Sequence, residues 1–314
     1  MSTETTTTDD ATREETETRG RIERLRASPF LSQLLSNRLA ILGLSIIAIM
    51  VLLALYARVT MDLSVVKASK LSDNPLASMK GPSGTYLFGT DLQARDIFSR
   101  VLYGAWYALE FGTIVVGAST LLGVSLGVIA AYYSDLVDNV IMRTMDVLLA
   151  FPSLLLALAL VAILPESWGL WRATLALTLV YTPRFARVVR GAALTVLENE
   201  YIDATVALGA TDPRVLVRHV LPNCLAPITV QSTLNFGLAI IDLAALSFLG
   251  FGASAGTPSW GLMLSNGVSQ GLLTGIWWWS FFPGLFLALT VLGFNLLGDG
   301  MRDALDPRMR EAVD

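Results

Sequence analysis

Two residue types that carry much of enzyme chemistry are almost missing from this chain of 314 residues. It contains one histidine, His219, and one cysteine, Cys224. A single cysteine cannot form an intrachain disulfide or a cysteine-based metal site. A single histidine leaves little room for hydrolytic or metal-dependent chemistry. We therefore expect no catalytic residue, no metal and no cofactor, and we interpret His219 as a structural hydrogen-bonding residue rather than a pH switch.

The sequence also lacks a nucleotide-binding loop. The pattern Gly-x-x-x-x-Gly-Lys-Ser/Thr does not occur, and none of the three lysines (Lys67, Lys70 and Lys80) follows a glycine. The backbone cradle and the lysine that hold phosphates in a P-loop ATPase are therefore absent. We predict that the chain is not an enzyme and that any ATP hydrolysis it uses belongs to another chain.

A few charged and amide side chains interrupt long apolar runs of the sequence. Such groups are costly in hydrocarbon and often mark a transport pathway. Asp242 lies in the outer part of its apolar run and is the best pathway candidate, whereas Asp146 lies near the end of its run, followed by Phe151-Pro152, and favours a structural role. The alternative for each is contact with a partner chain or snorkelling to an interface. The candidate pathway residues are Asp242, Asn235, Asn295 and Glu110.

The composition is that of an integral membrane protein. Hydrophobic residues make up 54% of the chain and charged residues only 15%, against about 25% charged residues in soluble domains. An apolar run covers 39–56, which as a helix would rise about 27 Å and nearly match the ~30 Å hydrocarbon core. We predict an all-α, polytopic fold of about six transmembrane helices, the first over 39–57 and the others over 104–131, 141–163, 172–190, 225–249 and 281–298.

The distribution of arginine predicts the orientation of these spans. Arginines gather before the first span, after the fourth and after the last, whereas 251–280 contains no lysine or arginine. By the positive-inside rule, both termini and the loop 191–224 are expected on the cytoplasmic side. The expected location is the plasma membrane. The remaining parts are a disordered to amphipathic cytoplasmic tail (1–38), an extracytoplasmic segment (58–100), a transmembrane core (101–300) and a cytoplasmic tail (301–314).

The segment 58–100 is too long for a simple turn. It could contact an outer partner, cover the mouth of a pore or serve as a flexible connector.

The loop 191–224 predicts a helix, a tight turn and a second helix. The first helix is expected over 200–208, and Gly209 suits the position after it, where φ is positive. Asp212 fits an N-cap and Pro213 a first helical position, so a second helix is predicted over 213–220, ending before Pro222. The loop is either an amphipathic surface connection or a docking element for a cytoplasmic partner.

Within this loop the residues resemble a known family. The loop is similar to the one that defines permease subunits of ABC importers, with its Glu-Ala-Ala, glycine and Leu-Pro positions. Two residues depart from the pattern, since Asp203 replaces the usual Glu and Thr205 the usual second Ala. The resemblance implies ATPase coupling by the following residues: Asp203, Ala204, Thr205, Gly209, Arg218, His219, Leu221, Pro222 and Asn223.

The resemblance covers most of the chain and indicates the dipeptide/oligopeptide/nickel permease branch. Three places depart from that branch: Gln93-Ala94 where Leu-Gly is usual, Trp106 near a usual Arg, and Leu243 at a usual Glu, with Asp242 one residue early. The matching stretches are 88–91, 95–100, 103–104, Tyr181 with Arg187 and Arg190, 218–223, 246–252, 258–261, 295–300 and 302–308.

The resemblance implies a permease subunit of an ATP-driven importer, forming half of a pathway for short peptides or a related small solute. Nickel chelates or sugars are alternative cargoes. A secondary transporter that needs no ATPase, or a structural subunit without a pathway, are alternative functions. The implied partners are a second homologous permease, two P-loop ATPase subunits, an extracytoplasmic solute-binding protein and membrane lipid, with no nucleic acid.

Overall fold

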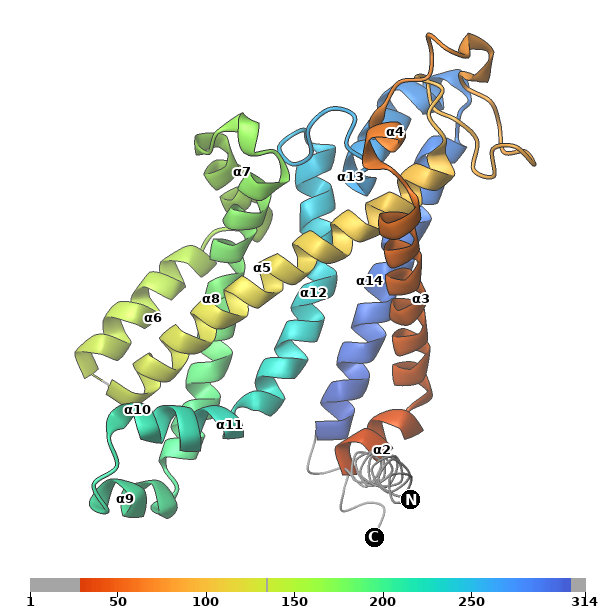
Figure 1. The fold of residues 1–314 in the computed structure, drawn as a ribbon. Helices are drawn as coiled ribbons and strands as arrows, with labels where there is room; N and C mark the ends of the chain where they lie inside the picture. The colour runs from red at the N-terminus through yellow and green to blue at the C-terminus, as the bar shows by residue number, and fades with distance from the viewer. Residues whose placement is uncertain (1–28, 134, 306–314) are drawn as a thin grey trace, which may run out of the picture.

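The computed structural model describes residues 29–133 and 135–305. Within these ranges the regular structure is helical apart from one isolated bridge between Thr90 and Asp96, which confirms the predicted all-α fold. The body of the molecule consists of long helices that run between its two ends (Figure 1): α3 (Arg38–Thr60), α5 (Ile97–Tyr133), α8 (Leu170–Leu197), α12 (Leu225–Phe248) and α14 (Trp278–Leu305).

Short helices mark the two ends of this bundle (Figure 1). One end, called here the α4 end, holds α4 (Leu63–Lys67), α7 (Ser153–Ile163) and α13 (Trp260–Asn266). The opposite end, the α9 end, holds α2 (Pro29–Ser36), α9 (Glu200–Ala207), α10 (Asp212–Val215) and α11 (Leu221–Asn223). The last turn of α14 also lies at the α9 end.

Among the described residues, α3, α5, α12 and α14 are long and apolar enough to cross a membrane. They confirm the helices predicted over 39–57, 104–131, 225–249 and 281–298, with ends that differ by up to seven residues. The helix predicted over 172–190 is present as α8 and continues to Leu197. Because it contains several arginines, it does not count as apolar enough to cross a membrane. The count of six spans therefore stays a prediction.

The prediction of one continuous helix over 141–163 is wrong. The structure has α6 (Asp135–Leu149) and α7, which are bent by 95° relative to each other. Pro152 lies at the break with φ −55° and ψ 129°. Because a proline disfavours helical geometry in the residue before it and has no N–H to donate, the helix ends ahead of it.

Glycines allow the long helices to pack closely. A Cβ on Gly127 of α5 would lie 2.5 Å from the carbonyl oxygen of Ala186 in α8, and one on Gly123 would lie 2.7 Å from that of Thr182. Gly43 of α3 likewise faces the backbone of α14 at Gly293. Small residues at such crossings let helix backbones approach in membranes, where packing replaces the hydrophobic effect.

The ends of the predicted tails lie outside the described residues, namely 1–28 and 306–314. Within the tail predicted over 1–38, α2 forms a short helix, and the side chain of Asn37 caps α3 by accepting from the backbone N–H groups of Leu39 and Ala40. At the other terminus, α14 continues as helix into the tail predicted over 301–314.

Candidate functional site

The candidate coupling loop contains the tight turn that its sequence predicts. α9 ends at Ala207, and Gly209 adopts φ +83°, which confirms the glycine position. A Cβ built on Gly209 would meet nothing within 4 Å. The requirement for glycine therefore comes from the left-handed backbone and not from a lack of space.

The start of the second helix differs from the prediction. Thr211 stands at the cap position, and Asp212 is the first residue of α10, so its predicted role as N-cap is wrong. The carboxylate of Asp212 instead accepts hydrogen bonds from the hydroxyls of Tyr132, at 2.9 Å, and Tyr133, at 3.2 Å. Both tyrosines end α5, so Asp212 ties the loop to the longest helix of the bundle.

The second helix also continues beyond its predicted end. Residues 216–220 form a π-helical turn, and α11 follows it through Pro222. A proline inside a helix lacks an N–H and its ring presses on the carbonyl four residues earlier, here that of Arg218. The wider π-turn, closed by the N–H of Leu221 on the carbonyl of Leu216, gives the ring room, so the helix does not stop before Pro222.

One face of this loop is buried against the bundle. Ile202 of α9 is buried, as are Val215 and Val220 of the second helix. Cys224 is fully buried in the same cluster as a free thiol, and burial raises the pKa of that thiol. The cluster joins the loop to α5, α8 and α12 through Val128, Ala131, Val189, Ala193 and Ile228. The loop is therefore fixed to the transmembrane helices and is not a loose connection.

The opposite face of α9 is exposed and largely apolar. Leu208 is 90% exposed and Tyr201 is 44% exposed. We call this surface the exposed α9 face, and it consists of Tyr201, Asp203, Ala204, Ala207 and Leu208. Its small residues leave the helix backbone close to the surface, so a partner can approach it closely. A helix fixed on one side and open on the other has the form of a docking element.

The remaining predicted coupling residues hold the two helices together or lie on their surface. Asn223 donates to the backbone oxygen of His219, at 2.6 Å, and to the hydroxyl of Tyr201, at 3.2 Å, which links α11 to α9. Thr205 donates to the carbonyl of Tyr201 at 2.7 Å. Arg218 and Pro222 are exposed, while Leu221 packs on the buried cluster.

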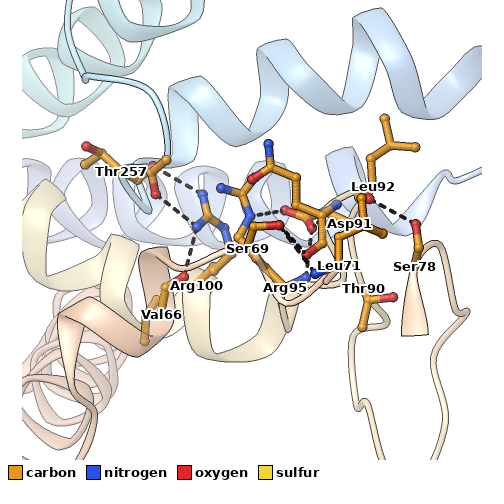
Figure 2. Close-up of polar contacts among 12 residues, drawn as sticks. Val66, Ser69, Leu71, Ser78, Thr90, Asp91, Leu92, Arg95, Arg100 and Thr257 are labelled. Carbon is orange, nitrogen blue, oxygen red and sulfur yellow. Dashed lines mark hydrogen bonds and ion pairs between the residues drawn. The ribbon is translucent and has the colours of Figure 1, made fainter. Parts of the chain in front are cut away.

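A second polar cluster lies at the α4 end, around Arg100 (Figure 2). Its side chain is 2% exposed and donates to the backbone oxygens of Val66, Gly256 and Thr257 at 3.0–3.3 Å. These acceptors belong to the segment 58–100 and to the loop before α13. A single buried guanidinium thus joins two loops that are far apart in sequence, because its fork of N–H groups can serve several carbonyls at once.

The segment 58–100 contains an ordered turn beside this arginine (Figure 2). Buried Asp91 forms an ion pair with Arg95 at 2.7 Å and also accepts from the backbone N–H groups of Gln93 and Arg95. Between them, Ala94 adopts φ +57°. This is a left-handed position that normally favours glycine, so the carboxylate of Asp91 holds the turn in shape.

Comparison with known proteins decides the family. The family model for the binding-protein-dependent transport system inner membrane component matches residues 123–311. The chain belongs to this family. It is 46% identical to the dipeptide transport system permease protein DppC of Alkalihalophilus pseudofirmus, over 88% of both chains. It is 45% identical to DppC of Escherichia coli, over 88% of this chain and 91% of that one.

A further relative and one solved structure are also similar to this chain. The di/tripeptide transport system permease protein DppC of Pseudomonas aeruginosa is 42% identical over 76% of this chain and 78% of its own. Among solved structures, the MetNI methionine ABC transporter in an inward-facing conformation is similar with a TM-score of 0.51. That match covers 67% of this chain and 98% of the other at 19% identity, and it supports the fold alone.

Asp242 is the candidate pathway residue with the most defined surroundings in the permease. It lies on α12 and is half-buried. The hydroxyl of Tyr181, on α8, donates to its Oδ2 at 2.8 Å. The guanidinium of Arg184, one turn further along α8, lies over the ring of Tyr181 at 4.8 Å from its centre. An acidic and a basic side chain therefore flank one buried tyrosine between α8 and α12.

The other candidate pathway residues are not brought together with Asp242. Asn235 is buried and accepts from Gln231 at 3.0 Å, and its amide nitrogen has no partner among the described residues. Asn295 lies where α14 crosses α12, with its Oδ1 2.9 Å from the place a Cβ would take on Gly237. Glu110 is exposed on α5. The four residues do not form one site within this chain.

Ion pairs between α6 and α8 were not expected from the sequence. Asp146 accepts from Arg187 at 2.7 Å, and Asp138 pairs with Arg190. The structural role expected for Asp146 agrees with this contact. Within the described ranges, no group of three or more histidine, cysteine, aspartate or glutamate side chains could hold a metal ion.

Proposed function

We propose that this permease is one subunit of an ATP-driven importer of short peptides, and that an ATPase subunit docks on its exposed α9 face. The observation that carries the proposal is the two-sided loop. Ile202, Val215 and Asp212 fix one side to the bundle, and Leu208 stands almost fully exposed on the other. A helix that transmits movement from a partner needs both a surface to grip and a firm attachment.

In this proposal the α9 end is the cytoplasmic side of the membrane. α2 and the last turn of α14 lie at the same end (Figure 1), which supports the prediction that both termini are cytoplasmic. The excess of arginine in the loop 191–224 and next to the terminal spans supports this orientation through the positive-inside rule. The cluster around Arg100 then faces the outside, where it supports the surface that receives a solute-binding protein.

The proposed cargo follows from the relatives. Permeases that are 42–46% identical over most of the chain are named for dipeptide or di/tripeptide transport. Short peptides are therefore favoured over nickel chelates or sugars. Competition among these solutes for uptake by the assembled importer distinguishes them, because only the true cargo class displaces a labelled dipeptide.

The proposed assembly contains a second homologous permease, two P-loop ATPases and an extracytoplasmic binding protein. ATP binding draws the ATPase subunits together and moves α9 with them. The buried cluster and the Asp212 contact carry that movement to α5 and α8, and the cavity between the two permeases opens outward. Alternating access requires each partner to bind the two states with different affinity.

Leu208 supplies the direct test. Burial of a leucine side chain is worth about 1.5–3 kcal/mol, so Leu208→Ala is expected to weaken ATPase binding by roughly ten- to a hundredfold. The measurement is titration of purified ATPase onto the permease pair in nanodiscs. Leu76→Ala is the matched control, because Leu76 is 82% exposed at the α4 end. Unchanged ATPase affinity in Leu208→Ala would contradict docking at this face.

Reconstitution separates this function from the alternatives. The permease alone in proteoliposomes is expected to carry no peptide, and uptake is expected only with ATPases, binding protein, second permease and ATP. Peptide uptake by the isolated chain along an ion gradient would support a secondary transporter instead. Full uptake by the complex without this chain would support a structural subunit.

A further inference from the structure

One face shared by α8 and α12 is left uncovered and carries polar side chains. On α12, Pro227, Gln231, Leu234, Leu238 and Asp242 follow one another at spacings of three or four, which places them on one side of the helix. None of the five is fully buried. On α8, Tyr181, Arg184 and Val188 have the same spacing; Arg184 and Val188 are partly exposed, whereas Tyr181 is buried. We call these eight residues the α8–α12 face.

A groove runs along this face at the α9 end. Its volume is 430 Å³, and its lining includes Val188, Gln231, Leu234 and Arg302. Asp242 lies eleven residues beyond Gln231 on the same side of α12, which is about 16 Å further toward the α4 end. The lining of the groove on α12 and Asp242 therefore lie along one side of that helix, and we call this line of residues the stripe.

The charged side chains on and beside this stripe, Asp242 and Arg184, are only partly satisfied by hydrogen bonds and ion pairs among the described residues. Tyr181 occupies Oδ2 of Asp242, while Oδ1 accepts no hydrogen bond within the described part of the chain. Arg184 touches the ring of Tyr181 but forms no ion pair with Asp242 among the described residues. Tyr181 thus separates the acid from the base, although a direct pair would be the cheaper arrangement in a membrane.

This pattern matches what all short peptides have in common. A free peptide carries an ammonium group at one end and a carboxylate at the other, whatever its side chains are. A fixed acid and a fixed base can bind these two groups and ignore the side chains between them. Gln231 and the apolar residues of the stripe offer contacts that do not discriminate by charge.

We propose that Asp242 binds the terminal ammonium group of the peptide in transit and that Arg184 faces its carboxylate. The inference rests on the proposed function. It assigns Tyr181 a positioning role, in which its hydroxyl orients the carboxylate and its ring holds the guanidinium apart from it. Asp242 then contributes to selecting peptides as a class inside the membrane.

The test uses the whole importer in proteoliposomes, with uptake of a labelled dipeptide and binding-protein-stimulated ATP hydrolysis as readouts. Asp242→Asn keeps the shape and the bond from Tyr181 but removes the charge. It is expected to lower uptake about tenfold or more, as for the loss of a charge-assisted hydrogen bond, while assembly and stimulated hydrolysis persist. Asp242→Glu is expected to restore most of the uptake. Glu166→Gln, an exposed acid in the turn before α8, is the control and should behave as wild type.

Each contrary result has a distinct meaning. Uptake within twofold of wild type in Asp242→Asn would overturn the inference. An equal loss of uptake in the Asn and Glu variants would mean that Asp242 serves only to pack the helices. Loss of the second permease during purification would mean that Asp242 holds the subunit interface. Either result would overturn the inference. A wild-type importer that carries no peptide would overturn the proposed function itself, and the inference with it.

A labelling experiment gives an answer that does not depend on uptake. The natural cysteine, Cys224, is fully buried, so Asp242→Cys introduces an addressable thiol. In the assembled complex this thiol is expected to react with a small cationic thiosulfonate reagent, and saturating dipeptide with loaded binding protein is expected to slow the reaction. A thiol that does not react in any nucleotide state would place position 242 away from the pathway and overturn the inference.

Discussion

Gly209 offers a sharp test of how the coupling loop works. Its φ of +83° is a left-handed conformation, and a Cβ there would meet no atom within 4 Å. Substitutions at Gly209 therefore probe backbone conformation with little steric interference from the permease itself. Three replacements separate the effects: asparagine, which tolerates the left-handed region, alanine, which does so poorly, and valine, which is β-branched and the least tolerant.

The magnitude follows from the cost of left-handed backbone. A non-glycine residue pays about 1–2 kcal/mol in this region, and one to two kcal/mol changes a conformational ratio by about 5–30-fold. We expect Gly209→Asn to be close to wild type, Gly209→Ala to shift the loop moderately, and Gly209→Val to populate the native turn least. When the turn opens, α9 loses its fixed angle to α10, and movement of a docked ATPase no longer reaches the bundle in full.

The assay is the ratio of peptide imported to ATP hydrolysed by the reconstituted importer. The expected order of coupling is wild type, Asn, Ala and then Val, with the complex still assembled. Gly191→Ala is the control, since Gly191 is a helical glycine of α8 with open space around it. Normal coupling in Gly209→Val would refute the reasoning. Asn and Val variants that are equally impaired would instead show that an ATPase contacts the bare backbone at Gly209.

Three further substitutions test contacts elsewhere in the permease. Asp212→Ala removes both tyrosine hydrogen bonds and is expected to raise hydrogen exchange in α9 and α10 several-fold; unchanged exchange would show that the contact does not hold the loop. Gly127→Ala brings a Cβ within 2.5 Å of α8 and is expected to lower the free energy of unfolding by about 1–3 kcal/mol. The control Gly117→Ala, whose Cβ meets nothing within 4 Å, should leave it unchanged. Equal unfolding temperatures for the two variants would contradict close packing of α5 on α8. Ala94→Gly relieves a φ of +57° and is expected to raise the unfolding temperature slightly, since about 1–2 kcal/mol of strain exceeds the entropy that glycine adds.

The helices that could be predicted were those whose length is set by the membrane. An apolar run must match the hydrocarbon thickness, so composition alone locates α3 and α12 to within three residues and α14 to within seven. The break between α6 and α7 was missed although Pro152 was visible, because the run stays apolar on both sides of it. A proline marks a position where a helix can break or bend, but the packing of the neighbouring helices determines whether it does.

Inside the coupling loop, the local features were predicted and the distant contacts were not. Gly209 follows from the rules of helix ends, which depend on a few neighbouring residues. The same rules predict Asp212 as an N-cap, whereas in the structure its carboxylate accepts a hydrogen bond from Tyr132, which lies 80 positions earlier. Tyr181 and Asp242 are 61 positions apart. A single sequence carries no signal for such pairs, because either residue alone fits its own helix.

The long helix α5 connects the coupling loop with the outer cluster. It has 37 residues and so is about 55 Å long, and it runs from the α4 end to the α9 end (Figure 1). Arg100 lies in its first turn and Tyr132 in its last. Arg100 holds the outer loops at Val66 and Thr257, while Tyr132 holds Asp212 of the coupling loop. A continuous helix does not shorten or stretch, so a displacement of its α9 end must tilt or shift its α4 end as well. We therefore expect that cutting the outer attachment with Arg100→Met leaves ATP-driven motion of α9 intact and abolishes the response of ATP hydrolysis to the loaded binding protein; a full response in that variant would mean that the outer signal reaches the ATPases by another helix.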